Sequence, residues 1–306
     1  MWLILSFISA ALLGFYDVFK KHSLTNNAVI PVLFLNTLFC SLIFLPLIGS
    51  SAAGWLPKES VFYVPTAGWA VHRFILLKSV IVLSSWILGY FGMKHLPITI
   101  VGPINATRPV MVLIGALLVF GERLNGLQWA GVITAILSFF LLSASGRKEG
   151  IRFSHNRWIY CVILAAVLGA VSGLYDKYLL APLSHGGAGL DQMTVQGWYN
   201  VYQCGLMLLI LLILWWPTRK KTTPLHWDWC IVGISVFLTI ADFVYFYALS
   251  MPDAMISIVS MVRRSSVVVS FGFGAILFHE HNLKAKSVDL MLVLLSMLFL
   301  WLGTRG

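Results

Sequence analysis

Residues 97–120 read PITIVGPINATRPVMVLIGALLVF, a stretch with one charged side chain, Arg108. At a rise of ~1.5 Å per residue, a helix of this length crosses the ~30 Å hydrocarbon core of a bilayer. Apolar runs of similar length recur on both sides of it. Counting this one, the ten runs are 2–19, 28–48, 73–93, 98–120, 125–145, 157–180, 194–216, 229–250, 253–278 and 286–304.

The composition indicates the same class of protein. Hydrophobic residues make up 59% of the 306 residues and charged residues only 10%, against about 25% in soluble domains. A soluble fold cannot bury so much apolar surface, whereas lipid solvates it. We therefore expect an all-α integral membrane protein with ten transmembrane helices.

The net charge of +10 does not indicate a nucleic-acid partner. The basic residues fall mostly in short gaps between apolar runs, where they face anionic lipid, so we expect membrane lipid and no nucleic acid as a partner. The run 2–19 is followed, not preceded, by basic residues, Lys20 and Lys21. A cleavable signal peptide has the reverse arrangement, so we expect this run to stay as the first membrane helix.

No pattern typical of a metal site or an enzyme is present in the sequence. His279-Glu280-His281 are adjacent, whereas zinc-binding helices space their ligands four residues apart. The four cysteines are scattered within apolar runs, and no DDxxD or HExxH cluster occurs. We expect no metal, no cofactor and no catalytic residues.

Short patterns of the first half recur in the second half in the same order. The paired positions, at offsets of 159, 164, 155 and 158, are Asp17 with Asp176, Asn36 with Asn200, Arg108 with Arg263 and Glu122 with Glu280. Five helices are an odd number of crossings, so two such halves lie in opposite orientations. We therefore predict two inverted five-helix repeats, 1–146 and 147–306, around a central cavity that binds substrate near the midplane.

Loop charge predicts the orientation of the chain in the membrane. The loops after the first, third, fifth, seventh and ninth helices carry twelve Lys and Arg residues, and the opposite side carries five. The twelve are Lys20, Lys21, Lys94, Arg147, Lys148, Arg152, Arg157, Arg219, Lys220, Lys221, Lys284 and Lys286; the five are Lys58, Arg73, Arg123, Lys177 and Arg305. The positive-inside rule then places both termini outside the cytoplasm.

Three arginines in the membrane interior are the most informative feature. Arg108 lies eleven residues after Pro97, roughly 16 Å along its helix and near the midplane, and Arg263 and Arg264 hold the corresponding place in the second half. Each such charge costs about 2.5–3.5 kcal/mol at a helix centre. Either they pair with acids of the bundle, or they form a positive pocket for an anion. A guanidinium group donates two parallel hydrogen bonds to phosphate or carboxylate.

Other polar residues complete the expected site. We expect Asn105, Asn36, Asn200 and Tyr245 to line the substrate site with the arginines, since Asn105 lies one helical turn before Arg108.

Acidic residues are the candidates for internal pairing, gating or proton coupling. They are Asp242, deep in its helix, and Asp17 and Asp176, near helix ends, which would close on Lys20 or Lys177 or be solvated there. Lys78 lies about five residues inside its helix, and we expect it to extend to the membrane surface.

Part of the sequence resembles a known protein family. The run from Pro97 to Leu142 is similar to the EamA-type repeat of the drug/metabolite transporter superfamily. The similarity rests on Leu96-Pro97, Arg108-Pro109, Gly121-Glu122-Arg123-Leu124 and Gln128-Trp129-Ala130-Gly131, and His279-Glu280 repeats part of it. The resemblance implies a ten-helix transporter that works by alternating access in a cell membrane, in a bacterium. Family members carry amino acids, other metabolites, sugar nucleotides or phosphorylated sugars, and carriers of phosphorylated sugars place basic residues in helices 4 and 9.

We therefore expect a secondary transporter of a small organic anion, a phosphorylated or carboxylate metabolite, in the cytoplasmic membrane. Proton coupling or exchange would balance the charge that such a solute carries. Two alternatives stay open: an exporter of amino acids or drugs, and a flippase for a lipid-linked phosphate.

Overall fold

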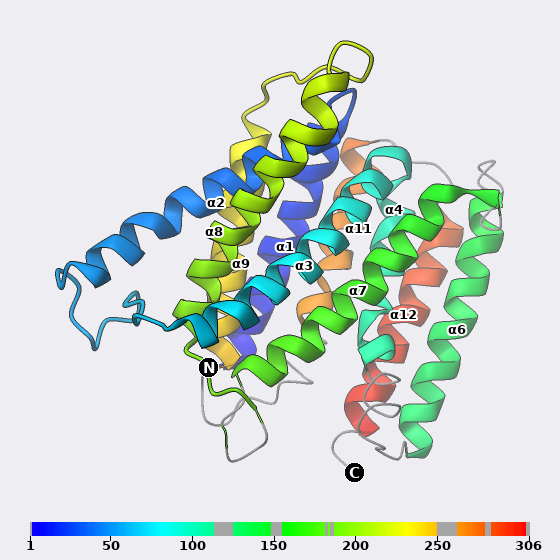
Figure 1. The fold of residues 1–306 in the computed structure, drawn as a ribbon. Coiled ribbons are helices and arrows are strands. Elements are labelled where there is room, and N and C mark those ends of the chain that lie inside the picture. Colours follow the sequence, from blue (N-terminus) through cyan, green and yellow to red (C-terminus); the bar gives the residue numbers. More distant parts are fainter. Residues whose placement is uncertain are drawn as a thin grey trace.

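The computed structural model of the protein describes residues 2–112, 125–147, 155–180, 183, 187–249, 262–278 and 283–303. Within these ranges the regular structure is helical and contains no strand. The α-helices, labelled in Figure 1, are α1 (Trp2–Leu24), α2 (Val29–Ala52), α3 (Trp69–His95), α4 (Ile98–Ala106), α6 (Gly126–Arg147), α7 (Arg157–Leu180), α8 (Gln192–Ile210), α9 (Cys230–Leu249), α11 (Ser266–Leu277) and α12 (Leu283–Gly303). A π-helical turn (Leu211–Trp215) and a 3-10 turn (Trp216–Thr218) extend α8.

Several of these helices have the length and apolarity that a bilayer requires. Within the described ranges six of them qualify: Trp2–Leu24, Val29–Ala52, Trp69–His95, Arg157–Leu180, Gln192–Thr218 and Cys230–Ala248. Shorter apolar helices run over Gly126–Ser138 and Ser287–Gly303. The chain is thus an all-helical, multi-pass membrane protein. Of the expected runs 98–120 and 253–278, residues 113–120 and 253–261 lie outside the described ranges.

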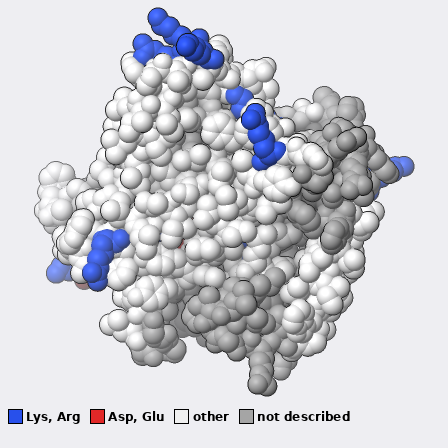
Figure 2. Space-filling view, turned by 45° about the vertical axis from the view of Figure 1, so that its right-hand side comes forward, with Lys and Arg blue, Asp and Glu red and all other residues white. Residues whose placement is uncertain are grey.

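The outer surface suits a lipid solvent. Large apolar side chains such as Ile4, Leu209 and Ile213 are exposed on it. In Figure 2, Lys and Arg gather at the edges of the visible face, and other residues form the broad middle between them. Exposed apolar patches of this kind are unusual in soluble proteins, so this surface faces the hydrocarbon.

The helices pack in four main pairs: α1 with α9, α6 with α12, α3 with α7 and α2 with α8. Helix α11 packs against both α1 and α4. Small residues permit the close crossings. A Cβ atom added to Gly131 of α6 would stand 2.8 Å from Cδ2 of Leu300 in α12. Because lipid provides no hydrophobic force between helices, such close backbone packing contributes much of their association.

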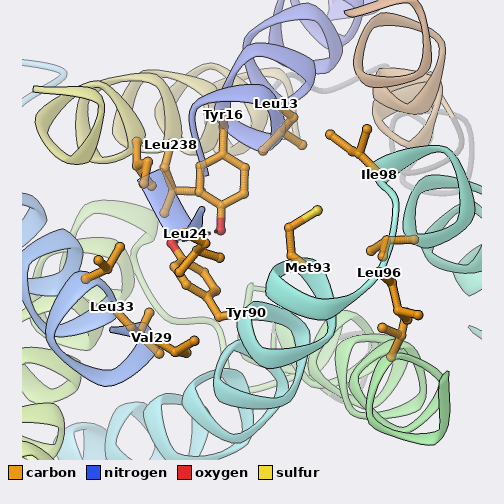
Figure 3. Close-up of a cluster of buried hydrophobic side chains, with 14 of the residues drawn as sticks. Leu13, Tyr16, Leu24, Val29, Leu33, Tyr90, Met93, Leu96, Ile98 and Leu238 are labelled. Carbon is orange, nitrogen blue, oxygen red and sulfur yellow. Dashed lines mark hydrogen bonds between the residues drawn. The ribbon is translucent and has the colours of Figure 1, made fainter. Parts of the chain in front are cut away.

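The largest buried cluster closes one end of the bundle, which we call the packed end. It lies where α1 and α3 end and where α2, α4, α7 and α9 begin, and it includes Leu24, Val29, Leu96, Ile98, Ile159 and Ile231. Figure 3 shows Tyr16 of α1 and Tyr90 of α3 directed toward each other in this cluster, with hydroxyl oxygens 3.5 Å apart. The first residue of α1 and the last residue of α12 lie at the opposite end (Figure 1).

Candidate functional site

Arg263 is bound by groups of α8 and α9. Its Nη2 donates to Oδ1 of Asp242, and the second carboxylate oxygen of Asp242 accepts a hydrogen bond of 2.9 Å from the hydroxyl of Tyr199. The guanidinium carbon of Arg263 lies 4.1 Å from the ring centroid of Tyr245, a cation–π distance. The sequence left open whether this arginine pairs with an acid, and the structure shows that it does.

Arg108 has no such partner. It follows the end of α4, and its Nη2 donates a hydrogen bond of 3.0 Å to Oδ1 of Asn105. Its guanidinium group lies against Gly169 of α7, where an added Cβ atom would stand 2.6 Å from the guanidinium carbon. Its Nε is buried without a hydrogen-bond partner, and the described residues place no carboxylate within 4.0 Å of it. Glycine at position 169 thus leaves room for the guanidinium group of Arg108, whose Nε has no hydrogen-bond partner among the described residues.

Arg264 adds a second guanidinium group without a carboxylate partner in the described part of the chain. Its side chain is half-buried. The charges of Arg108 and Arg263 both act on it, so the three arginines lie in one region. Asp242 neutralises one of these charges, which leaves the region positive.

Asp17 forms an ion pair with a basic residue of its own helix. Its Oδ1 lies 2.6 Å from Nζ of Lys20, three residues further along α1. Lys20 is buried, and its ammonium group also lies 4.3 Å from the ring centroid of Tyr16. Asp17 and Lys20 thus form an ion pair in this structure, and the gating role of Asp17 stays a prediction.

Asp176 of α7 forms an ion pair with Lys78 of α3. Only 3% of Lys78 is exposed, so our expectation that it reaches the membrane surface is wrong. The physical reason is the pairing itself. A buried ammonium group is stable when a carboxylate binds it, and the ring of Tyr199, 5.0 Å away, adds a cation–π contact.

Two of the expected site residues have partners of other kinds. Asn36 of α2 donates a 3.1 Å hydrogen bond to the Tyr90 hydroxyl, and its side-chain oxygen accepts one of 3.1 Å from Ser235 of α9. Asn200 donates to the carbonyl oxygen of Gln196, one turn earlier in α8. The structure thus brings Asn105 to Arg108, and Asp242 and Tyr245 to Arg263. It gives Asn36 and Asn200 partners other than the arginines.

The structure places in the interior several polar residues that were not among the substrate-binding and gating residues expected from the sequence. Lys78 and Tyr199 connect Asp176 to Asp242, as described above. Gln196 and Gln203 of α8 are fully buried, and neither amide oxygen nor amide nitrogen has a hydrogen-bond partner in the described part of the chain. Their spacing of seven residues, two helical turns on one face, is the sequence signal that would have found them.

Some sequence predictions fall outside the described residues. These are the Gly121-Glu122 and His279-Glu280-His281 patterns, Pro252 and the side chain of Lys177.

Residues 1–144 match the EamA-like transporter family, which confirms the resemblance predicted from the sequence. No curated protein matches the chain. A crystal structure of a protein with 15% sequence identity superposes with a TM-score of 0.64, covering 99% of this chain and 99% of that chain. At this identity the likeness shows the fold alone. The chain is thus a multi-pass membrane protein whose residues 1–144 match a family of small-solute transporters.

Proposed function

We propose, from the premise that residues 1–144 belong to the EamA-like transporter family, that this protein is a secondary transporter of a small organic anion. A phosphate ester or a carboxylate is the class of solute that suits its arginines best. No step of this proposal requires a cofactor or a catalytic residue.

The observation that carries the proposal is an imbalance of charge. Asp17, Asp176 and Asp242 each bind a basic residue already, respectively Lys20, Lys78 and Arg263. Arg108 and Arg264 are left without a carboxylate in the described part of the chain. Two unneutralised guanidinium groups are costly inside a membrane protein, and an anion with two negative charges would offset that cost.

Two aspects of the architecture support ten helices in two inverted repeats, 1–146 and 147–306. Exchange of the two halves turns the pair of α1 and α9 into the pair of α7 and α3. It turns the pair of α2 and α8, the pair of α6 and α12 and the smaller contact of α4 with α11 into themselves. The first residue of α1 and the last residue of α12 also lie at the same end of the bundle, as an even number of crossings requires (Figure 1).

Alternating access follows from this arrangement. The packed end is closed by the apolar cluster of Leu24, Leu96 and Ile231, so a solute would reach the arginines from the other end in this conformation. Loop charge places the packed end in the cytoplasm and both termini outside. The two halves would then rock around the bound solute to open the packed end.

Asp242 offers a route to proton coupling. An anionic solute bound at Arg263 competes with the carboxylate of Asp242. A carboxylate displaced from its arginine inside the membrane is stabilised by protonation. Solute binding and proton uptake would therefore be linked, while Asp176 acts as a gating group through its ion pair with Lys78, which joins the two halves.

The proposal is tested by thermal unfolding of the purified protein in detergent at fixed ionic strength. Phosphate esters and carboxylates should raise the melting temperature, because a ligand at 100 times its Kd stabilises the folded state by about 2.7 kcal/mol. Arg108→Gln and Arg264→Gln should each weaken this binding about 10- to 100-fold, the effect of losing a hydrogen bond to a charged group. Arg219→Gln, in an exposed position after α8, is the matched control and should bind as the parent does.

Other outcomes would replace the proposal. Stabilisation by amines or neutral amino acids alone would favour an exporter of amino acids or drugs, and stabilisation by lipid-linked phosphate alone would favour a flippase. If Arg108→Gln and Arg264→Gln both bound the anion as tightly as the parent, these arginines would not form the anion site.

A further inference from the structure

A second group of polar side chains lies at the packed end, away from the arginines. His22 belongs to the last turn of α1, Asp228 precedes α9, and Cys230 is the first residue of α9. One ligand atom from each of the three lies within 4.8 Å of the others. Nε2 of His22 and Oδ2 of Asp228 are 3.7 Å apart.

We propose that His22, Asp228 and Cys230 bind a divalent transition-metal ion of the Zn²⁺ class. An imidazole nitrogen, a carboxylate oxygen and a thiolate sulfur are the ligands that Zn²⁺ takes in proteins, at about 2.0–2.3 Å. Two such ligands of a tetrahedral ion lie about 3.5 Å apart, so the three side chains need only a small adjustment. The fourth position is left to water.

Charge and accessibility fit such an ion. The carboxylate and the thiolate together carry two negative charges, which neutralise a divalent cation. His22 is exposed, while Asp228 and Cys230 are half-buried, so an ion can enter from solvent.

Asp228 and Cys230 are held in place by the start of α9. Oδ1 of Asp228 accepts a hydrogen bond of 3.0 Å from the backbone N–H of Cys230, and its carbonyl oxygen accepts one of 2.9 Å from the N–H of Ile231. These bonds leave Oδ2 of Asp228 directed at His22.

The ion would connect the two halves of the chain. His22 lies in the first half, and Asp228 and Cys230 lie in the second. Hydrogen bonds already join the halves at this end: Asn27 bonds to the backbone of His226 at 2.8 and 3.0 Å, and Lys94 donates to Thr223 at 3.1 Å. A metal ion added here would hold the packed end closed. This consequence for transport rests on the proposed function, whereas metal binding itself does not.

The test is a metal titration of the full-length protein in detergent after treatment with a chelator. We expect one Zn²⁺ per chain, and with Co²⁺ a thiolate-to-metal charge-transfer absorption. Cys230→Ser and His22→Gln should each weaken binding by about 100-fold or more, since loss of even an outer-shell partner costs 10- to 100-fold. Cys161→Ser, which alters another partly exposed cysteine, in α7, should leave binding unchanged.

A second measurement, the melting temperature with and without Zn²⁺, shows whether each variant is folded. Zn²⁺ should raise the melting temperature of the parent and of Cys161→Ser but not that of Cys230→Ser. Binding should also tighten as pH rises, because the histidine and the thiol must lose protons. The proposal would be overturned if the parent did not bind Zn²⁺. It would also be overturned if Cys230→Ser and His22→Gln bound Zn²⁺ as tightly as the parent does. Because no solute is present, neither result depends on what the protein transports.

Discussion

The interface of α3 with α7 and the interface of α1 with α9 are equivalent in the proposed repeat, yet different forces hold them. In the first, Lys78 binds Asp176 across the two helices. In the second, the ring of Phe237 in α9 stacks on Phe19 of α1 with centroids 5.2 Å apart. Asp17, the counterpart of Asp176, binds Lys20 of its own helix instead.

This difference shows which contacts a conformational change must break. An ion pair within one helix survives any movement of that helix, because both partners travel together. The pair between Lys78 and Asp176 joins the two halves, so it is lost when α3 and α7 separate. Separation of α1 from α9 costs apolar contacts, which depend little on charge. The contact of Lys78 with Asp176 is therefore charge-sensitive, and the contact of Phe237 with Phe19 is not.

The largest effect is expected for Lys78→Met. The substitution leaves the carboxylate of Asp176 in the interior without its partner, and breaking a buried ion pair in this way costs about 3–5 kcal/mol of folding free energy. SDS titration in mixed micelles measures the free energy of unfolding. The double variant Lys78→Met with Asp176→Leu removes both charges and should recover most of the loss. A double variant no more stable than Lys78→Met would show that the charges do not act as a pair.

A smaller effect is expected for Phe237→Ala at the equivalent interface. The variant loses ring contacts with Phe19 and with Phe15, whose ring centroid is 5.7 Å away, and should cost about 2 kcal/mol. Because no ionisable group takes part, the loss should be the same at pH 5 and pH 8. A loss that changes with pH would contradict the apolar character of this interface.

The smallest effect is expected for Lys20→Met. Removal of the lysine does not leave the carboxylate of Asp17 isolated, because Asp17 is 20% exposed and the charge of Arg108 also acts on it, so the loss should be about 1 kcal/mol. Tyr16, which the ammonium group faces, retains its contact with Tyr90. Thermal unfolding of this variant beside Lys78→Met compares the two aspartates directly. Equal losses would mean that the local pair and the inter-helix pair are not distinct.

The fold class and the family follow from local properties of the chain. The length of each apolar run, the absence of charge within it and the basic gaps between runs are visible one segment at a time. The same reasoning identified Arg108 and Arg263 as costly charges that need a partner. It could not choose those partners, because the acids lie on other helices, and helix spacing along the chain does not specify which helices are neighbours.

Lys78 illustrates the limit. Five residues inside an apolar run, a lysine can reach the membrane surface or turn inward, and the choice depends on what the neighbouring helix presents. Asp176, 98 positions away, decides it. The cluster of His22 and Cys230 is a second case, since its residues lie in different halves and have no recognisable spacing.

Membrane insertion, helix positions and the presence of interior charge are set by the sequence, because the transfer of each segment from water to lipid depends on that segment alone. The identity of the charges that remain unneutralised is set by tertiary structure. Helix packing assigns Asp242 to Arg263, and in the described part of the chain it leaves Arg108 against Gly169 without an acid, because ion pairing requires a few ångströms of separation that only the folded bundle provides.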